Sequence, residues 1–397
     1  MYYLLYNNEY AVLDKDDVVI YNENGDIVCR NILTFEASKE SAMKNGYDHF
    51  MLKEIFEQPY VLKETIKDYV SNINNLNEKM NGLEKYDAID IVGCGSAYHV
   101  GLVGKILITK YANIPVNVEI ESEYRYSDHV YSKKHLIILI SQSGETADTL
   151  AVLRKVKQNG IDTLAIVNVV GSSIARESDK VLYIKAGPEI AVATTKAYSC
   201  QLIMLSLIAT YLGIKRKVLK EDTLDIFDDI DVLINDVLKN TKEIEKIAKK
   251  IYRKKDVFFL GRKVDYSLSM EASLKLKEIS YIHSEAYAAG ELKHGTISLI
   301  EKNMPVISII TDDDIKFKTL SNIKEVCARG AFSIIITNDG EIDKELYSNI
   351  ILIPKVHELV SPLLVIVKCQ LLSYYVAKLK GCDIDKPRNL AKSVTVE

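Results

Sequence analysis

The chain has 397 residues, of which 48% are hydrophobic, and a formal net charge of −4 at pH 7. A chain of this length can bury more than one core, so two or three domains are expected. Lysine and arginine are spread along the sequence without a dense basic block, which argues against nucleic-acid binding. No apolar run reaches the roughly 18 residues of a membrane span, and the N-terminus lacks a signal-peptide pattern. We therefore expect a cytoplasmic protein without a membrane segment.

The cysteines and histidines give no sign of a disulfide, a metal site or a cofactor. No C-x-x-C motif is present, and no pair of histidines has the spacing of zinc ligands. The loop Gly93-Cys94-Gly95-Ser96 carries only two glycines of the dinucleotide-binding motif, and no suitably placed carboxylate follows it. We expect reduced, buried thiols and no bound cofactor.

In chain order, the first element is a short β-hairpin. Residues 1–33 contain alternating strand patterns around Asn24-Gly25, a dipeptide typical of hairpin turns. This piece is too short to form a core of its own. The segment Phe50–Asn74 then shows a helical pattern.

The rest of the chain repeats one order of elements at an offset of about 170 residues. In the first copy the apolar runs are Ile89–Val92, Leu136–Ile140, Thr163–Val167 and Val181–Ile184. In the second copy they are Val257–Leu260, Val306–Ile310, Ser333–Ile336 and Asn349–Ile353. Each run is short and apolar on successive residues, which is typical of a strand in a parallel sheet covered on both faces.

The sequence therefore predicts an α/β fold with two tandem domains related by internal duplication, each a parallel-sheet three-layer sandwich. A long apolar helix closes each copy, Ala197–Tyr211 in the first and Pro362–Leu379 in the second. The Lys- and Glu-rich stretch Leu219–Lys255 is expected to form bridging helices. The expected boundaries are 1–46 for the N-terminal piece, 47–240 and 241–382 for the two domains, and 383–397 for the C-terminal tail.

A hydroxyl-rich loop follows the second predicted strand of the first copy. Ligands of open parallel sheets bind at this edge, beyond the carboxyl ends of the strands. The segment Ser141-Gln142-Ser143-Gly144-Glu145-Thr146 offers three hydroxyls, an amide and a glycine at the start of a helix, a set that suits a phosphate. The alternative is that these side chains only cap the helix. Three hydroxyls within six residues favour the phosphate.

The segment Met270–Tyr281 has helical spacing and places Lys275 between Glu271 and Glu278 on one face. Such a triplet suits proton transfer. The alternative is a solvated ladder of ion pairs, which is the common reason for this spacing.

Two further segments are rich in polar groups. The stretch Ile282–Gly295 is expected to be a loop crowded with ionisable side chains, among them His294. The C-terminal segment Asp385–Glu397 is polar at both ends, and its pattern alone leaves open whether it is a frayed terminus or part of a site.

Four segments, in order along residues 1 to 397, resemble signature segments of the glutamine–fructose-6-phosphate aminotransferases, also called glucosamine-6-phosphate synthases. They are FMLKEIFEQP at Phe50–Pro59, ISQSGETADTL at Ile140–Leu150, KLKEISYIHSEAYAAGELKHG at Lys275–Gly295 and PRNLAKSVTVE at Pro387–Glu397. Members of this family carry two sugar isomerase (SIS) domains, in agreement with the duplication. They begin with a glutaminase domain whose N-terminal cysteine attacks glutamine, whereas residue 2 here is Tyr2. Residues 1–46 resemble only the last hairpin of that domain and the linker, so the glutaminase domain is expected to be missing.

The resemblance implies roles for individual residues. Lys392 would form a Schiff base with the ketone of fructose 6-phosphate, Glu278 would move a proton between C1 and C2, and His294 from the neighbouring subunit would open the ring. The implied phosphate ligands are Ser96, Ser141, Gln142, Ser143 and Thr146. Five more residues are implied to line the substrate site: Thr194, Glu271, Lys275, Arg388 and Ala391.

The chemistry agrees with these roles. A lysine attacks a carbonyl only as the neutral amine, so a cationic neighbour such as Arg388 or Lys275 would help Lys392. Four positions differ from the family's usual residues, so the phosphate contacts are expected to differ in detail: Ser96 replaces Thr, Ala97 replaces a hydroxyl, Thr194 replaces Ser and Thr296 replaces Pro.

The function implied is the isomerase half of glucosamine-6-phosphate synthase. A homodimer would convert fructose 6-phosphate to glucosamine 6-phosphate when a glutaminase domain supplies ammonia, the first step of hexosamine and UDP-N-acetylglucosamine synthesis. One alternative is a stand-alone deaminase or isomerase of a related amino sugar phosphate. Another is a non-catalytic sugar-phosphate sensor, which would need none of Lys392, Glu278 and His294.

Overall fold

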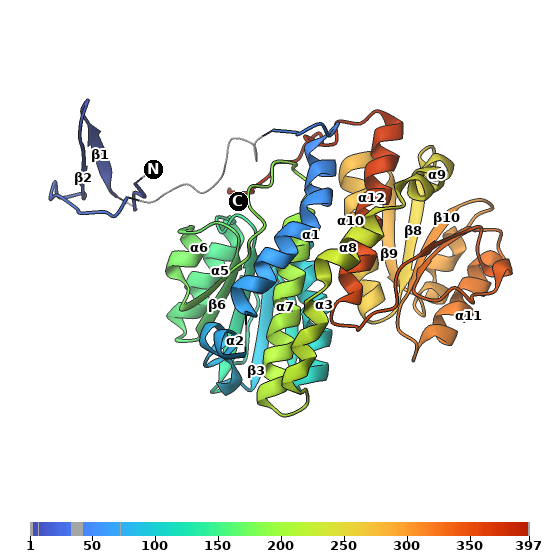
Figure 1. Cartoon of the computed structure of the whole chain (residues 1–397), viewed down its shortest axis with the longest axis horizontal. Coiled ribbons are helices and arrows are strands. Elements are labelled where there is room, and N and C mark those ends of the chain that lie inside the picture. The colour runs from blue at the N-terminus through green and yellow to red at the C-terminus, as the bar shows by residue number, and fades with distance from the viewer. Residues whose placement is uncertain (1–2, 7, 33–42, 72, 396–397) are drawn as a thin grey trace. The chain divides into compact units, whose positions relative to one another are not determined.

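The computed structural model describes residues 3–6, 8–32, 43–71 and 73–395 (Figure 1). The chain divides into two compact units, residues 1–43 and 44–397, which are described separately. Residues 1–2, 7, 33–42, 72 and 396–397 lie outside the described residues, and with them lie parts of the predicted N-terminal piece 1–46, of the helical segment Phe50–Asn74 and of the C-terminal tail.

The first unit contains the strands β1 (Tyr10–Leu13) and β2 (Val18–Tyr21), which pair antiparallel. Their turn is closed by a hydrogen bond of 2.9 Å from the backbone N–H of Asp14 to the carbonyl of Asp17. At the predicted turn the N–H of Gly25 donates to the carbonyl of Asn22 at 3.0 Å, and the chain returns through a single bridge to β2. A hairpin is therefore present, but its two strands are joined by a turn earlier than the predicted one.

The second unit contains two five-stranded sheets in which every neighbouring pair of strands is parallel. The first sheet has the order β4-β3-β5-β6-β7, with β3 Ala88–Gly93, β4 Val116–Ile120, β5 His135–Ser141, β6 Asp162–Val167 and β7 Lys180–Tyr183. The second has the order β9-β8-β10-β11-β12, with β8 Asp256–Gly261, β9 His283–Ala288, β10 Pro305–Ile310, β11 Phe332–Thr337 and β12 Asn349–Leu352. The two sheets have the same topology, so the predicted fold class and duplication are confirmed.

The two edge strands β4 and β9 were not predicted. The strand β4 is buried only at alternate positions, and β9, with the sequence HSEAYA, is polar and mostly half-buried. The expectation of a continuous loop over Ile282–Gly295 is therefore wrong for residues 283–288, which pair with β8. Residues Leu292–His294 and Thr296–Leu299 then form two short 3-10 helices.

Helices cover both faces of each sheet. The larger ones are α1 Phe50–Tyr69, α2 Ile73–Met80, α3 Ser96–Ala112, α5 Ala147–Gln158, α7 Lys196–Lys215, α8 Ile230–Leu238, α9 Thr241–Ile251, α10 Val264–Ser280, α11 Lys316–Cys327 and α12 Ser361–Lys380. The short helical turns are Leu83–Lys85, α4 Glu121–Tyr124, α6 Ser173–Glu177, Glu221–Phe227 and Lys344–Leu346.

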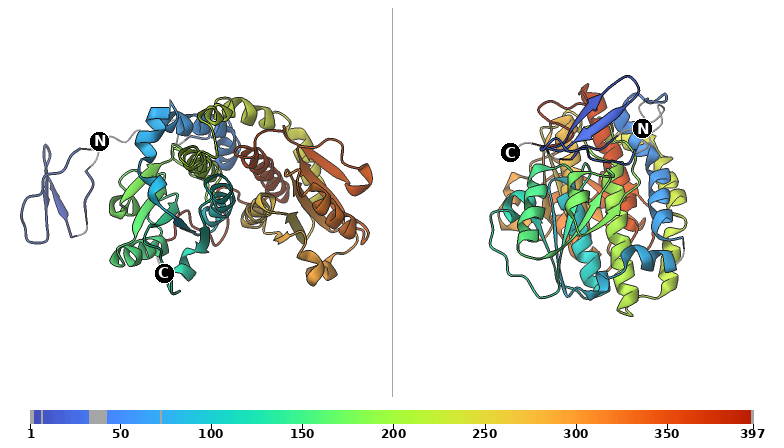
Figure 2. Two further views of the ribbon diagram at one scale, coloured as in Figure 1. Left: turned by 90° about the horizontal axis from the view of Figure 1, so that it is seen from below. Right: turned by 90° about the vertical axis from the view of Figure 1, so that its left-hand side faces the viewer.

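The main hydrophobic core lies between the two sheets. The helices α1, α3, α7, α10 and α12 fill this space (Figures 1 and 2) and share one apolar cluster with the inner faces of both sheets. The helices α5 and α6 cover the other face of the first sheet, and α11 covers that of the second. Because α3 and α10 pack on each other, the residues that begin and line these helices come close together.

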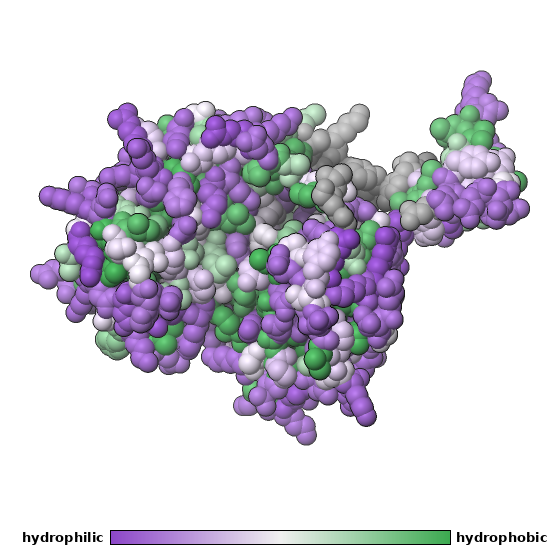
Figure 3. Space-filling view, turned by 180° about the vertical axis from the view of Figure 1, so that it is seen from behind, coloured by the Kyte–Doolittle hydropathy of each residue, from purple (hydrophilic) through white to green (hydrophobic). Residues whose placement is uncertain are grey.

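The helices α7 and α12 are long and apolar enough to span a membrane, but 94% and 83% of their most apolar windows are buried inside the unit. Their apolar character is explained by their place in the core, since each packs against other helices on several sides. On the face shown in Figure 3 the surface is mainly hydrophilic, with apolar residues exposed in small groups. All six cysteines are unpaired. The expectation of buried thiols is confirmed for Cys200 and Cys369, but Cys327 and Cys382 are half-buried and Cys29 and Cys94 are exposed.

Candidate functional site

The hydroxyl-rich loop lies where the sequence placed it, between the end of β5 and the start of α5. The hydroxyls of Ser141 and Thr146 are hydrogen-bonded at 2.9 Å. The backbone N–H of Gly144 donates to Ser141 Oγ at 3.1 Å, and that of Glu145 donates to Ser143 Oγ at 3.2 Å. The loop therefore gathers three hydroxyls and two backbone N–H groups in one place, and such groups can donate to an anion.

The capping alternative does not explain these side chains. The residue before α5 is Thr146, and its side chain makes no capping hydrogen bond to the helix. The first N–H of the helix, that of Ala147, donates instead to the carbonyl of Val394 in the C-terminal tail at 3.3 Å. Gly144 has φ of +65°, and a β-carbon there would lie 2.0 Å from Ser172 Oγ, so this position requires glycine.

Ser96 begins α3 directly after β3, the strand beside β5 in the first sheet. Its hydroxyl donates to Glu271 Oε1 of α10 at 2.9 Å, and His99 Nδ1 lies 2.8 Å from Glu271 Oε2. The carboxylate of Glu271 is 0% exposed. These contacts connect the ligand edge of the first sheet with the charged face of α10.

The predicted triplet on α10 forms one buried ion-pair group. Lys275 Nζ lies 2.5 Å from Glu278 Oε2 and 3.5 Å from Glu271 Oε1. Burial by itself would lower the pKa of Lys275, but the two carboxylates outweigh it and the pKa is raised, so the lysine stays charged. Lys275 is 1% exposed, which excludes the solvated-ladder alternative. Glu278 keeps 21% of its side chain exposed and is the member of the group that solvent reaches.

The C-terminal tail reaches the first sheet rather than fraying. The hydroxyl of Ser393 donates to Ser143 Oγ at 3.2 Å. Lys392 Nζ donates to Glu189 Oε2 at 2.6 Å and to the carbonyl of Ala191 at 2.9 Å. The cationic neighbour expected for Lys392 is not among these contacts, because its partners are a carboxylate and a carbonyl.

The residue that holds Lys392, Glu189, was not predicted. Burial opposes its charge, but the Lys392 ammonium and hydrogen bonds from Thr194 and Thr195 lower its pKa to about 2. Thr194 Oγ1 donates to it at 2.6 Å. The charge of Glu189 also contributes to the raised pKa of Lys275, so the tail and the α10 triplet are electrostatically connected. The only signal in the sequence is a lone acid in the loop between β7 and α7, five residues before the Thr-Thr-Lys that leads into the helix.

The remaining predicted residues are less closely connected. The carbonyl of Gln142 accepts a hydrogen bond from the N–H of Asn168 at 3.2 Å. The guanidinium of Arg388 lies 4.3 Å from the ring centroid of Tyr281, just beyond α10. Ala391 and His294 are exposed, and the side chain of His294 makes no hydrogen bond or ion pair with the residues that the structure describes.

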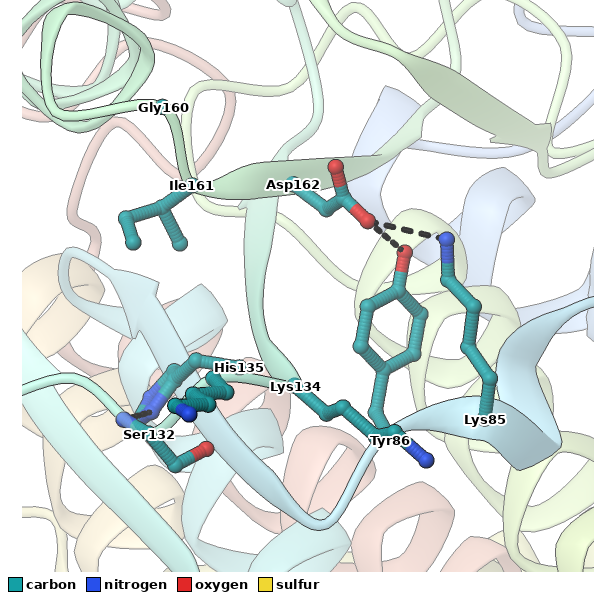
Figure 4. A pocket seen from close by; sticks show the side chains of 9 residues that line it. Lys85, Tyr86, Ser132, Lys134, His135, Gly160, Ile161 and Asp162 are labelled. Atoms are coloured by element: carbon teal, nitrogen blue, oxygen red, sulfur yellow. Dashed lines mark hydrogen bonds and ion pairs between the residues drawn. The ribbon is translucent and has the colours of Figure 1, made fainter.

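A separate pocket of about 200 Å³ lies at the opposite edge of the first sheet (Figure 4). Its lining consists of Lys85, Tyr86, Ser132, Lys133, Lys134, His135, Gly160, Ile161 and Asp162. These residues precede or begin β3, β5 and β6, at the amino ends of the strands. Asp162 accepts a hydrogen bond of 2.7 Å from Tyr86 and pairs with Lys85 at 2.9 Å. None of the predicted site residues lines this pocket.

Over the described part of the chain, no group of three or more His, Cys, Asp or Glu side chains could hold a metal ion.

Comparisons with known proteins agree with this arrangement. The SIS domain model matches residues 82–211 and 250–379. The chain is 49% identical over 406 residues to the glutamine–fructose-6-phosphate aminotransferase (isomerizing) of Clostridium tetani, a match that covers 100% of this chain and 67% of that protein. Among solved structures it is similar to the C-terminal domain of glucosamine-fructose-6-phosphate aminotransferase from Francisella tularensis, with 40% identity, a TM-score of 0.82 and coverage of 87% of this chain and 100% of that one. It is also similar to glucosamine-6-phosphate deaminase from Thermotoga maritima, with 25% identity, a TM-score of 0.70 and coverage of 87% and 99%. The chain therefore belongs to the glutamine–fructose-6-phosphate aminotransferase (isomerizing) family and carries the two SIS domains of that enzyme.

Proposed function

We propose that the chain performs the sugar half-reaction of its family on fructose 6-phosphate. The phosphate would bind to Ser96 and to the loop Ser141–Thr146, with Gln142 and Thr194 beside it. The observation that supports this most strongly is the course of the tail, which brings Lys392 next to that loop through the contact of Ser393 with Ser143.

In the proposed mechanism, Lys392 leaves Glu189 and attacks C2 of the open-chain ketose as a neutral amine. Loss of water gives the imine, whose positive charge makes the C1 proton acidic. Ammonia then adds to C2 of this imine and the Lys392 amine leaves, which frees the lysine and leaves an ammonia-derived imine at C2. Glu278 takes the proton from C1 and returns it to C2, which gives the aldose glucosamine 6-phosphate. The buried Lys275 and Glu271 hold Glu278 and Ser96 in place, and Arg388 and Ala391 line the site from the tail.

Two parts of the proposal involve more than the described chain. His294 would open the sugar ring in the site of a neighbouring subunit, which agrees with its exposure and requires a homodimer. Ammonia for glucosamine 6-phosphate would come from a glutaminase domain, as the names of the relatives suggest. The domain boundaries at 46, 240 and 382 and a cytoplasmic location remain predictions from the sequence.

The second candidate is a deaminase acting on glucosamine 6-phosphate through the same lysine. The similarity to the Thermotoga maritima deaminase favours this candidate over a non-catalytic sensor. The two enzymes differ in direction, so a substrate profile separates them.

The decisive experiment measures the conversion of fructose 6-phosphate in buffer alone, with glutamine and with ammonium. Lys392→Ala should abolish conversion, whereas Lys386→Ala, an exposed lysine in the same tail, should not. Borohydride should trap a sugar adduct on Lys392. If both variants turn over fructose 6-phosphate like the unchanged chain, or if the adduct forms on another lysine, the proposed mechanism is wrong.

A further inference from the structure

A second buried carboxylate lies beside Glu189 and has no part in the proposed sugar chemistry. Glu54 is on α1 and is 1% exposed. Its Oε1 accepts hydrogen bonds from the backbone N–H groups of Ile190 at 2.5 Å and Ala191 at 3.3 Å. Its Oε2 is buried and has no hydrogen-bond partner among the described residues.

The turn that Glu54 holds is the one that binds Lys392. Glu189, at the start of this turn, and the carbonyl of Ala191, at its end, are the two acceptors of the Lys392 ammonium. Each acceptor is therefore within two residues of an amide fixed by Glu54. A shift of the turn relative to α1 would move both acceptors together.

The cations near Glu54 are paired with other carboxylates. Glu189 faces it from the turn, Lys392 from the tail and Lys196 from α7. Lys196 is already paired with Glu57 at 2.8 Å, on the same helix as Glu54, and Glu57 lies 3.5 Å from Lys53. Lys392 is paired with Glu189, and Oε2 of Glu54 has no hydrogen-bond partner among the described residues. Burial and then the charge of Glu189 raise the pKa of Glu54 to about 8, which agrees with a protonated carboxyl at neutral pH.

We propose that Glu54 is a positioning residue for Lys392: its protonated carboxyl anchors the turn 189–191 on α1 without adding a second negative charge beside Glu189. The inference rests on the proposed function for its importance to catalysis, but not for its geometry. Ionisation of Glu54 at high pH would hold the Lys392 ammonium more tightly and so keep it from reacting.

Competitive acetylation of the whole chain with acetic anhydride, read by mass spectrometry, tests this without any sugar. The reagent modifies only neutral amines, so the rate at Lys392 relative to the exposed Lys318 reports how firmly its ammonium is held. The variants are Glu54→Gln, which imitates the protonated acid, and Glu54→Ala, which removes the anchor. Glu64→Gln, on the same helix, is the matched control.

At pH 7 the Glu54→Gln variant should match the unchanged chain within about twofold, because both carry a neutral side chain at this position. At pH 9 it should react roughly tenfold faster at Lys392, the change that one pKa unit produces. Glu54→Ala should react faster than the unchanged chain at both pH values. Glu64→Gln should change nothing.

Equal rates in all four proteins at both pH values would overturn the proposal. The proposal would also be overturned if Lys392 were labelled as fast in Glu54→Gln as in Glu54→Ala at pH 7. The ionised carboxylate, and not the neutral acid, would then be needed to hold the turn. Lys275, which is 1% exposed, serves as a folding control in the same samples, because it becomes labelled only if a variant opens. If the Glu54→Ala variant unfolds, the pH dependence of the Lys392 labelling rate in Glu54→Gln still tests the proposal. A failure of sugar conversion with these rates as expected would count against the proposed function alone.

Discussion

The buried triplet on α10 makes a sharp prediction about stability. Replacing Lys275 by Met keeps most of the buried volume but removes the cation shared by Glu271 and Glu278. The two pairs have N–O separations of 3.5 and 2.5 Å, and Lys275 and Glu271 are 1% and 0% exposed. Two carboxylates, one of them fully buried, would then share one site without a counter-ion.

The magnitude follows from two opposing effects. At an effective dielectric constant of about 20, each Coulomb attraction at these separations is about 5–7 kcal/mol. Desolvation of each ion costs several kcal/mol in the other direction, so the net value of the intact group is small. Removal of one partner leaves the desolvation cost without the attraction, and we expect Lys275→Met to lose about 3–5 kcal/mol of unfolding free energy at pH 7.

Urea denaturation followed by circular dichroism at several pH values measures this loss. The double variant Lys275→Met/Glu271→Gln should recover part of it at pH 7. Lys277→Met, at the exposed neighbouring lysine, should stay within about 0.5 kcal/mol of the unchanged chain.

The contribution of Lys275 to the unfolding free energy of the unchanged chain depends on pH with a defined sign. The pKa of Lys275 is raised in the folded state, so its contribution is fully present below its unfolded value of 10.5 and is lost only as the pH rises further. Between pH 6 and 9 this lysine should therefore contribute no slope. A Lys275→Met variant as stable as Lys277→Met at pH 7 would show that the triplet is solvated, and our reading of the site would have to be abandoned.

Three further predictions concern the same region. Gly144→Ala should destabilise the chain by about 1–3 kcal/mol and weaken sugar-phosphate binding, because the new β-carbon would clash with Ser172. The control is Gly160→Ala, where φ is similar and the space is open, and this change should cost only about 1 kcal/mol of unfolding free energy. Equal losses in the two variants would contradict the clash. Gln370→Leu removes one of the two acceptors of Gln58 Nε2, at 2.8 Å, and should lower the free energy of unfolding by about 1–3 kcal/mol in a thermal or urea melt. A loss below about 0.5 kcal/mol would count against a buried hydrogen bond between the two side chains. The pKa of Glu54 is raised from 4.5 to about 8, so its neutral form stabilises the fold, and this contribution is lost as the pH rises from about 5 to 8. Across that range the unfolding free energy of Glu54→Gln should rise by about 2–4 kcal/mol relative to that of the unchanged chain. Parallel curves of unfolding free energy against pH for the two proteins would refute the assignment.

The strands show which parts of the fold were predictable. Central strands such as β5 are buried on both faces, so their residues are apolar in succession and visible as runs. The edge strands β4 and β9 are covered on fewer sides and carry polar residues, which leaves no such run. The same limit explains the hairpin of the first unit, where Asn24-Gly25 marked a turn but not the turn that joins β1 and β2.

In the site, too, local patterns were predictable from the sequence, whereas contacts between distant segments were not. Hydroxyls clustered after a strand indicated the loop Ser141–Thr146, and helical spacing placed Glu271, Lys275 and Glu278 on one face. Neither pattern could say whether these groups were exposed or which residues they would meet. The roles of Lys392 and His294 came from resemblance, and they remain predictions.

The sequence by itself determined the two duplicated parallel sheets, because strand and helix periodicities are local properties of the residues. Only the tertiary structure decided which charged side chains are buried and desolvated. Glu54 looks like any acid of an amphipathic helix until α1 packs against the turn at Glu189, and Lys392 meets that turn from 203 residues away. Contacts of that range depend on how whole layers pack, and burial of a charge depends on every atom around it, so neither can be read from neighbouring residues in the sequence.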